Sequence, residues 1–203
     1  MAIELKNSVF IHIPKTGGRT IKHLILNHVD NYKIIGDEIY DAHGTPKTDK
    51  QVFAFVRHPA TFIKSLWEQR ARIKKNKHGH RFNWQEYLRL EKECQSEDYN
   101  IFVKNILQGR NYVQDYYKHY TDMYPSVQFG KMESLVLDFM NILKRNDERF
   151  DEKNILKNIK LKSGKNRGAD STNINKSGMT KEQLKYLVDV SEKELCSRFN
   201  YEI

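Results

Sequence analysis

Residues 8–20 read SVFIHIPKTGGRT, and this stretch decides the fold that we predict for the chain. Ser8 to Ile13 is a run of β-branched and aromatic residues, which is typical of a strand. Residues 14–20 contain two adjacent glycines, and apolar residues at helical spacing follow from Ile21 onward. The stretch therefore predicts a strand, a glycine-containing loop and a helix in direct succession.

A second strand of this kind is predicted at residues 51–56, which read QVFAFV. This run is nearly continuously apolar, as expected of a parallel strand that is buried on both faces. Pro59 then opens a helix, and shorter strands are predicted at Tyr32 to Ile35 and at Val127 to Met132. Because strands alternate with helices, we predict an α/β fold with a mainly parallel sheet flanked by helices. A length of 203 residues fits one domain, residues 1–203.

The rest of the chain is mostly helical in pattern. Thr180 and Gln183 form a capping-box pair that begins a last helix, ending near Phe199. Residues 70–81 indicate a basic helix end that runs into a loop, and residues 163–178 indicate a long, turn-rich loop. Further helices are predicted at 84–94, 101–107, 133–144 and 151–161.

The composition favours a basic, globular protein. The 35 Lys and Arg against 26 Asp and Glu leave a formal net charge of +9, which favours a polyanionic partner, although a lysine-rich solvated surface has the same composition. Cys94 and Cys196 lie in unrelated segments, so we expect no disulfide framework and no metal site. We see no export signal or membrane anchor, and we expect a cytoplasmic protein that binds no membrane.

The first candidate site is the glycine-containing loop. Glycines between a strand and a helix let backbone N–H groups approach an anion, and the helix N-terminus adds partial positive charge. The lysine precedes the glycines here, whereas the P-loop of nucleotide hydrolases places it after them, so an ordinary ATPase is disfavoured. A glycine turn that only joins a strand to a helix would look the same. The candidate phosphate-binding residues are Pro14, Lys15, Thr16, Gly17, Gly18, Arg19 and Thr20.

The second candidate site follows the strand at residues 51–56. Arg57 ends this strand, and Ser65 lies one or two turns into the next helix. A forked guanidinium and a hydroxyl can hold a phosphate together. An arginine after a buried strand can also be an ordinary surface residue, so this pair alone does not decide between the two interpretations.

Taken together, FIHIPKTGGRT (residues 10–20) and FAFVRHPATFIKS (residues 53–65) resemble the cofactor-binding signatures of the sulfotransferase family that uses 3′-phosphoadenosine 5′-phosphosulfate, particularly its carbohydrate-modifying branch. The resemblance implies a P-loop-NTPase-like sulfotransferase fold and transfer of a sulfuryl group to an acceptor hydroxyl. It also implies that residues 14–20 bind the 5′-phosphosulfate, and that Arg57 and Ser65 bind the 3′-phosphate.

The resemblance extends more faintly along the chain. QFGKMESL (residues 128–135) looks like the later strand-to-helix segment of the family, and INKS (residues 174–177) like its asparagine-lysine-serine loop. Phe62 stands where many relatives place a second arginine, and Arg19 stands where they often place a small hydroxyl residue. The family's basic cap over the 3′-phosphate and adenine has as candidates here Lys165, Arg167 and Gly168.

The implied reaction assigns two catalytic roles. Lys15 is suited to stabilise the charge that appears on the departing 5′-phosphate. His43 matches the position of the base histidine in heparan-type relatives, and a neutral imidazole can take the acceptor proton. A turn histidine without a catalytic role remains the alternative for His43. No metal is required, because arginine and lysine take its place.

The acceptor side is less defined by the sequence. The resemblance places the basic run from Arg70 to Lys77 where acceptors enter, so a functional run would favour an acidic carbohydrate acceptor. Five tyrosines could line an acceptor groove or pack in the core, since tyrosine combines an apolar ring with a hydroxyl. They are Tyr112, Tyr116, Tyr117, Tyr120 and Tyr124.

Three other functions stay open. A nucleotide kinase-like P-loop enzyme would share the broad fold, and the position of the lysine in the loop argues against it. A non-catalytic basic module could bind nucleic acid through its lysines, but no nucleic-acid motif is recognisable and we expect no nucleic-acid partner. A pseudo-enzyme could keep the cofactor site and lack the base.

Overall fold

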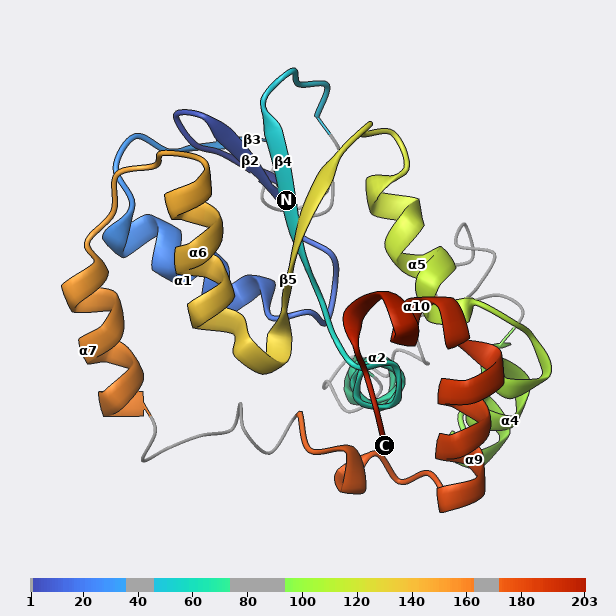
Figure 1. Cartoon of the computed structure of the whole chain (residues 1–203). Helices are drawn as coiled ribbons and strands as arrows, with labels where there is room; N and C mark the ends of the chain where they lie inside the picture. Colours follow the sequence, from blue (N-terminus) through green and yellow to red (C-terminus); the bar gives the residue numbers. More distant parts are fainter. Residues whose placement is uncertain (1, 36–45, 74–93, 163–171) are drawn as a thin grey trace. The chain divides into compact units, whose positions relative to one another are not determined.

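The computed structural model describes residues 2–35, 46–73, 94–162 and 172–203 (Figure 1). These residues belong to two compact units, one from Met1–Arg57 and Tyr117–Ala169 and the other from His58–Tyr116 and Asp170–Ile203. Each unit is described by itself. The extent of a single domain over residues 1–203 stays a prediction.

The first unit is built on one five-stranded sheet. Parallel pairing joins β4 to both β2 and β5, so the carboxyl ends of these three strands lie at one edge of the sheet. This arrangement confirms the predicted α/β class. The strands are β1 (Ala2–Glu4), β2 (Ser8–Ile11), β3 (Lys33–Ile35), β4 (Gln51–Val56) and β5 (Val127–Lys131), in the order β3-β1-β2-β4-β5.

The sheet is mixed, and the prediction of a mainly parallel sheet was wrong in this respect. Strand β1 pairs antiparallel with both β2 and β3. Only three residues separate β1 from β2, which is enough to reverse the chain but not to cross over to a parallel strand. The Leu5 N–H donates to the Ser8 carbonyl at 2.8 Å and closes this reversal. The short apolar run Ala2–Ile3, for which we had predicted no strand, is buried at the sheet.

The core of the first unit lies between the sheet and three helices (Figure 1). These are α1 (Gly18–His28), α6 (Leu135–Arg145) and α7 (Glu152–Lys162). Residues Val52 to Val56 of β4 are all buried, as their continuous apolar sequence predicted. The buried residues of this core are Ile3, Leu5, Phe10, Ile21, Leu24, Ile25, Val29, Phe53, Phe55, Phe139, Met140, Ile142, Leu143 and Ile155.

The connection from β5 to α6 differs slightly from the predicted helix at residues 133–144. A 3₁₀ turn, η1 (Met132–Ser134), comes first, and α6 begins at Leu135. The Asp138 carboxylate holds this turn, since it accepts from the Lys131 N–H at 2.7 Å and from the Ser134 hydroxyl at 2.8 Å. Helix α7 agrees with the predicted helix at residues 151–161 to within one residue at each end.

The second unit is helical. Asp98 caps α4 by accepting from the N–H groups of Asn100 and Ile101, and the rings of Phe62 and Tyr116 pack edge to face at 5.1 Å. The elements are α2 (Pro59–Ile73), α4 (Tyr99–Gln108), the start of α5 (Tyr112–Thr121), η3 (Ile174–Lys176), α9 (Lys181–Tyr186), η4 (Leu187–Ser191) and α10 (Lys193–Phe199).

The last predicted helix is interrupted. Its capping box is confirmed, because the Thr180 hydroxyl and the Gln183 side chain each accept from the other residue's backbone N–H. A π-helical turn, η4, then separates α9 from α10. Glu192 follows this turn and is fully buried. Its carboxylate accepts from the N–H groups of Val113 and Gln114 at 2.8 and 3.2 Å, which caps the start of α5.

Several predicted features lie partly or wholly outside the described residues. These are the helix at 84–94, of which only Cys94 is described, and the end of the basic run after Ile73. The predicted loop at 163–178 is described only from Thr172. Among the helices that are described, none combines the length and the apolar character that a membrane span requires.

Glu192 makes the stability of the fold depend on pH. Burial raises the pKa of Glu192 from 4.5 to about 7, against the opposing effect of its two backbone hydrogen bonds. Because the folded pKa lies above the unfolded one, the contribution of this group to stability is complete below pH 4.5 and is lost as the pH rises through about 7. We expect the free energy of unfolding to fall by about 3 kcal/mol more in the wild type than in Glu192→Gln between about pH 4 and 8.

Urea denaturation across this pH range measures the difference between the two proteins. Glu194→Gln is the matched control, since it removes an exposed carboxylate only two residues away, in the first turn of α10. It should keep the pH dependence of the wild type. An identical pH dependence in the wild type and Glu192→Gln would contradict the assignment.

Candidate functional site

The loop after β2 has an unusual backbone conformation. Lys15 has a φ of +68° and Gly17 a φ of +91°, so two of three successive residues are left-handed. For lysine this conformation is unfavourable, and residues held in this way cluster at functional sites. The Thr16 hydroxyl donates to the Ile13 carbonyl at 2.8 Å, and Thr16 is 1% exposed. This buried hydrogen bond closes the loop on itself.

The loop leads into the N-terminus of α1, where the Thr20 N–H donates to the Gly17 carbonyl at 2.9 Å. Gly17 is the N-cap residue, no side chain caps the helix, and no acidic residue lies in the first turn. Arg19 and Thr20 are exposed in that turn, while Lys15 is half-buried just before it. An uncapped helix N-terminus beside cationic side chains favours a bound phosphate or sulfate group.

Gly18 is required by its neighbour His12. A Cβ atom at residue 18 would lie 1.8 Å from Cδ2 and 2.1 Å from Nε2 of His12. The His12 imidazole in turn stacks on Phe10, with 6.3 Å between ring centroids. The second glycine of the motif therefore allows the end of β2 and the first turn of α1 to approach closely.

Space for a side chain at residue 17 is limited by residues that follow β5, the third parallel strand. A Cβ atom at residue 17 would lie 3.0 Å from Leu135 Cδ1, and the Met132 side chain is also close. Met132 belongs to η1, the turn that follows β5, and Leu135 is the first residue of α6. The turn after β5 thus packs against the loop after β2, as expected where parallel strands end at the same edge of a sheet.

Arg57 connects the two predicted motifs. It follows β4, is 3% exposed, and its Nη1 donates to the Lys15 carbonyl at 3.2 Å. Because β4 lies beside β2 and parallel to it, the residues after both strands meet. The interpretation of Arg57 as a simple surface residue is wrong, since its side chain is buried.

Tyr117 holds the backbone of Arg57. Its hydroxyl accepts from the Arg57 N–H at 3.1 Å and donates to the Arg57 carbonyl at 2.9 Å. Sequence reasoning did not assign this role, because five tyrosines fall in the same segment. All five are buried, so of the two alternatives for them the structure favours core packing over an open groove.

No contact among the described residues links the other predicted site residues to Lys15 and Arg57. Ser65 lies half-buried in α2, in the second unit, and its phosphate-binding role stays a prediction. Phe62, at the position of the missing second arginine, is buried against Tyr116. The remaining predicted residues, His43, Lys165, Arg167 and Gly168, lie outside the described residues.

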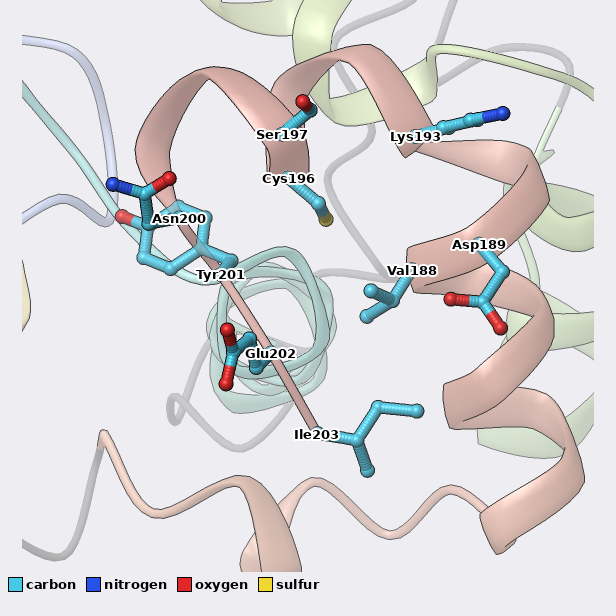
Figure 2. A pocket seen from close by; sticks show the side chains of 9 residues that line it. All are labelled: Val188, Asp189, Lys193, Cys196, Ser197, Asn200, Tyr201, Glu202 and Ile203. Carbon is cyan, nitrogen blue, oxygen red and sulfur yellow. The ribbon is translucent and has the colours of Figure 1, made fainter.

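A pocket of about 630 Å³ lies in the second unit and shares no residue with the loop after β2. Figure 2 shows side chains of η4, α10 and the segment after it around this pocket. Cys196 is its candidate nucleophile, but burial raises the pKa of this thiol to about 12, so it is not a thiolate at neutral pH. The pocket is lined by Val188, Asp189, Lys193, Cys196, Ser197, Asn200, Tyr201, Glu202 and Ile203.

Among the described residues, no cluster of three or more His, Cys, Asp or Glu side chains could hold a metal ion. Comparison of the chain with protein-family models, with curated proteins and with solved structures gave no significant match. The chemistry of the site therefore has to be argued from its own residues.

The geometry makes the edge of the sheet after β2 and β4 an anion-binding candidate. The start of α1, which no side chain caps, and the residues Lys15 and Arg57 belong to this edge. A guanidinium donates to carboxylate or phosphate oxygens in a fixed fork, and an ammonium group acts as a compact charge. The arrangement is suited to bind a ligand that carries phosphate or sulfate groups.

The close packing of His12 against residue 18 predicts a specific effect of substitution. Gly18→Ala should lower the free energy of unfolding by about 1–3 kcal/mol, because the new methyl group would overlap the imidazole. The double variant His12→Ala/Gly18→Ala should lose less than the sum of the two single variants, since removing the ring makes room. Chemical denaturation measures all three.

Gly109→Ala is the matched glycine control. A Cβ atom at residue 109 would meet nothing closer than the Ile106 carbonyl at 3.6 Å, and its φ of −92° suits alanine. This substitution should change the free energy of unfolding by less than about 0.5 kcal/mol. Equal stability of Gly18→Ala and the wild type would show that the contact with His12 imposes no constraint.

Proposed function

We propose that this protein is a sulfotransferase, which moves a sulfuryl group from 3′-phosphoadenosine 5′-phosphosulfate to a hydroxyl of a carbohydrate acceptor. The observation that carries the proposal is the contact of the Arg57 guanidinium with the Lys15 carbonyl. It joins the two segments whose sequences resemble the family's cofactor signatures. The proposal includes a P-loop-NTPase-like sulfotransferase fold, for which the strand, loop and uncapped helix at residues 8–28 are the local support.

The proposed roles follow the charges of the site. The N–H groups at the start of α1 and the residues Pro14 to Thr20 bind the 5′-phosphosulfate, and Arg57 binds the 3′-phosphate with Ser65 and the basic segment at 165–168. The left-handed backbone at Lys15 is supported by the bond from Arg57. The buried bond from the Thr16 hydroxyl to the Ile13 carbonyl also holds this loop, so its conformation does not depend on Arg57 alone.

The cosubstrate supplies the sulfuryl group, and the acceptor oxygen displaces 3′-phosphoadenosine 5′-phosphate in line. An oxygen–sulfur bond to the acceptor forms while the bond between sulfur and the 5′-phosphate oxygen breaks. His43 takes the proton of the acceptor hydroxyl, and Lys15 stabilises the negative charge on the departing phosphate. Because cationic side chains do this work, the proposed mechanism uses no metal ion.

Calorimetric titration tests the proposal. The wild type should bind 3′-phosphoadenosine 5′-phosphate more tightly than 5′-AMP or ATP, because only the first ligand carries the 3′-phosphate. In Arg57→Ala this affinity should fall by about tenfold to a hundredfold, the range expected for lost hydrogen bonds to a charged group. Affinity for 5′-AMP should fall much less.

Arg145→Ala is the control for charge alone. Arg145 is exposed in the last turn of α6, so its replacement removes one positive charge from the same unit without touching the site. It should leave the affinity for both ligands unchanged to within about twofold.

Equal or tighter binding of ATP by the wild type would favour a kinase-like enzyme. Salt-sensitive binding of nucleic acid with no nucleotide binding would favour a basic binding module.

A further inference from the structure

The hydroxyl of Tyr117 makes two hydrogen bonds to one residue. The Arg57 N–H donates to it at 3.1 Å, and it donates to the Arg57 carbonyl at 2.9 Å, with both atoms of the backbone buried. Arg57 is the first residue past the register of β4 with β5, which ends at Val56 opposite Lys131. The tyrosine thus provides the hydrogen bonds that the strand ladder no longer provides at this position.

This double contact controls where the Arg57 side chain begins. The N–H of a residue belongs to the peptide plane before its Cα, and its carbonyl belongs to the peptide plane after it. A single atom that is hydrogen-bonded to both groups therefore restrains both planes. The side chain that leaves this restrained Cα is 3% exposed and reaches the Lys15 carbonyl at 3.2 Å. The position of the guanidinium is therefore linked to Tyr117 through the backbone.

Tyr117 itself is well fixed for this purpose. It lies in α5 and is buried, and its carbonyl accepts from the Thr121 hydroxyl one helical turn later at 3.1 Å. A buried phenol on a helix has few rotamers, so its hydroxyl is held at a defined point. The Tyr117 hydroxyl can therefore determine the backbone position of Arg57, the residue that follows β4.

We propose that Tyr117 is a positioning residue that sets the selectivity of the anion site for a nucleotide with a 3′-phosphate. The inference rests on the proposed function, in which Arg57 is the ligand of that phosphate. Tyr117 acts through the Arg57 backbone and does not contact the nucleotide itself. Without its hydroxyl, the guanidinium is no longer preorganised, so the part of the affinity that comes from the 3′-phosphate decreases while the part from the 5′-phosphate is retained.

The test compares two tyrosine-to-phenylalanine variants. Tyr117→Phe removes the clamp on Arg57. Tyr124→Phe is the matched control, because Tyr124 is also buried in the first unit and its hydroxyl donates to a backbone carbonyl, that of Pro46, at 2.8 Å. Thermal unfolding of both variants establishes that each is folded at the temperature of the binding assay.

Calorimetry then gives the affinities for 3′-phosphoadenosine 5′-phosphate and for 5′-AMP. The preference is the Kd for 5′-AMP divided by the Kd for 3′-phosphoadenosine 5′-phosphate. It should fall about five- to tenfold in Tyr117→Phe, the effect expected from the loss of about one buried hydrogen bond. It should stay within about twofold of the wild-type ratio in Tyr124→Phe. A purely structural role of Tyr117 would lower both affinities, or neither, and leave the ratio unchanged.

A second arm shows whether the effect passes through Arg57. In an Arg57→Ala background, Tyr117→Phe should have no further effect on the affinity ratio, because the group that it positions is absent. Additive effects of the two substitutions would overturn the inference. If Tyr117→Phe does not fold, hydrogen exchange of the wild type replaces it, and binding of 3′-phosphoadenosine 5′-phosphate should then slow exchange of the Arg57 amide more than 5′-AMP does.

The outcomes separate this inference from the proposed function. A wild-type protein that prefers 3′-phosphoadenosine 5′-phosphate, together with an unchanged preference in Tyr117→Phe, overturns the inference and leaves the proposed function standing. A wild-type protein without that preference overturns the proposed function, and the inference fails with it. Only a preference that is present in the wild type and in Tyr124→Phe, and reduced in Tyr117→Phe, supports both.

Discussion

The parallel pairing of β2 with β4 is the constraint on which the site depends. In this register Phe10 lies opposite Phe53, so both strands end at the same edge of the sheet. An antiparallel pair would place residues 14–20 and Arg57 at opposite edges. Because the pair is parallel, the arginine reaches the Lys15 carbonyl, and two motifs about forty residues apart in the sequence become one arrangement of charges.

The left-handed backbone at Lys15 is the cost of this arrangement, and hydrogen bonds within the loop and from Arg57 offset it. A lysine in this conformation is unfavourable by about 1–2 kcal/mol. The bond from Arg57 and the buried bond from Thr16 to Ile13 are together comparable to this cost, since each contributes about 1 kcal/mol. The packing of Leu135 against Gly17 further restricts the loop. The loop conformation is thus determined by the ends of all three parallel strands.

Local sequence was enough to predict the elements that carry the site, and not enough for the contacts between them. The apolar run of β4, the loop before α1 and the capping box at Thr180 follow from residue type and spacing, and the structure confirms them. Strand β1 was missed because three residues, Ala2–Glu4, are too few to show a period of two. The π-helical turn was missed because its residues are compatible with an ordinary helix.

The five tyrosines show why the remainder of the site could not be predicted. Nothing in the sequence distinguishes one of them from another, and all five are buried in the structure. In the structure the hydroxyl of Tyr117 holds the backbone of Arg57, and that of Tyr124 holds the Pro46 carbonyl, contacts of 60 and 78 residues in sequence separation. Which carbonyl a buried hydroxyl meets is decided by how a helix packs on the edge of a sheet. The selectivity of an anion site can therefore depend on a residue whose sequence position gives no indication of it.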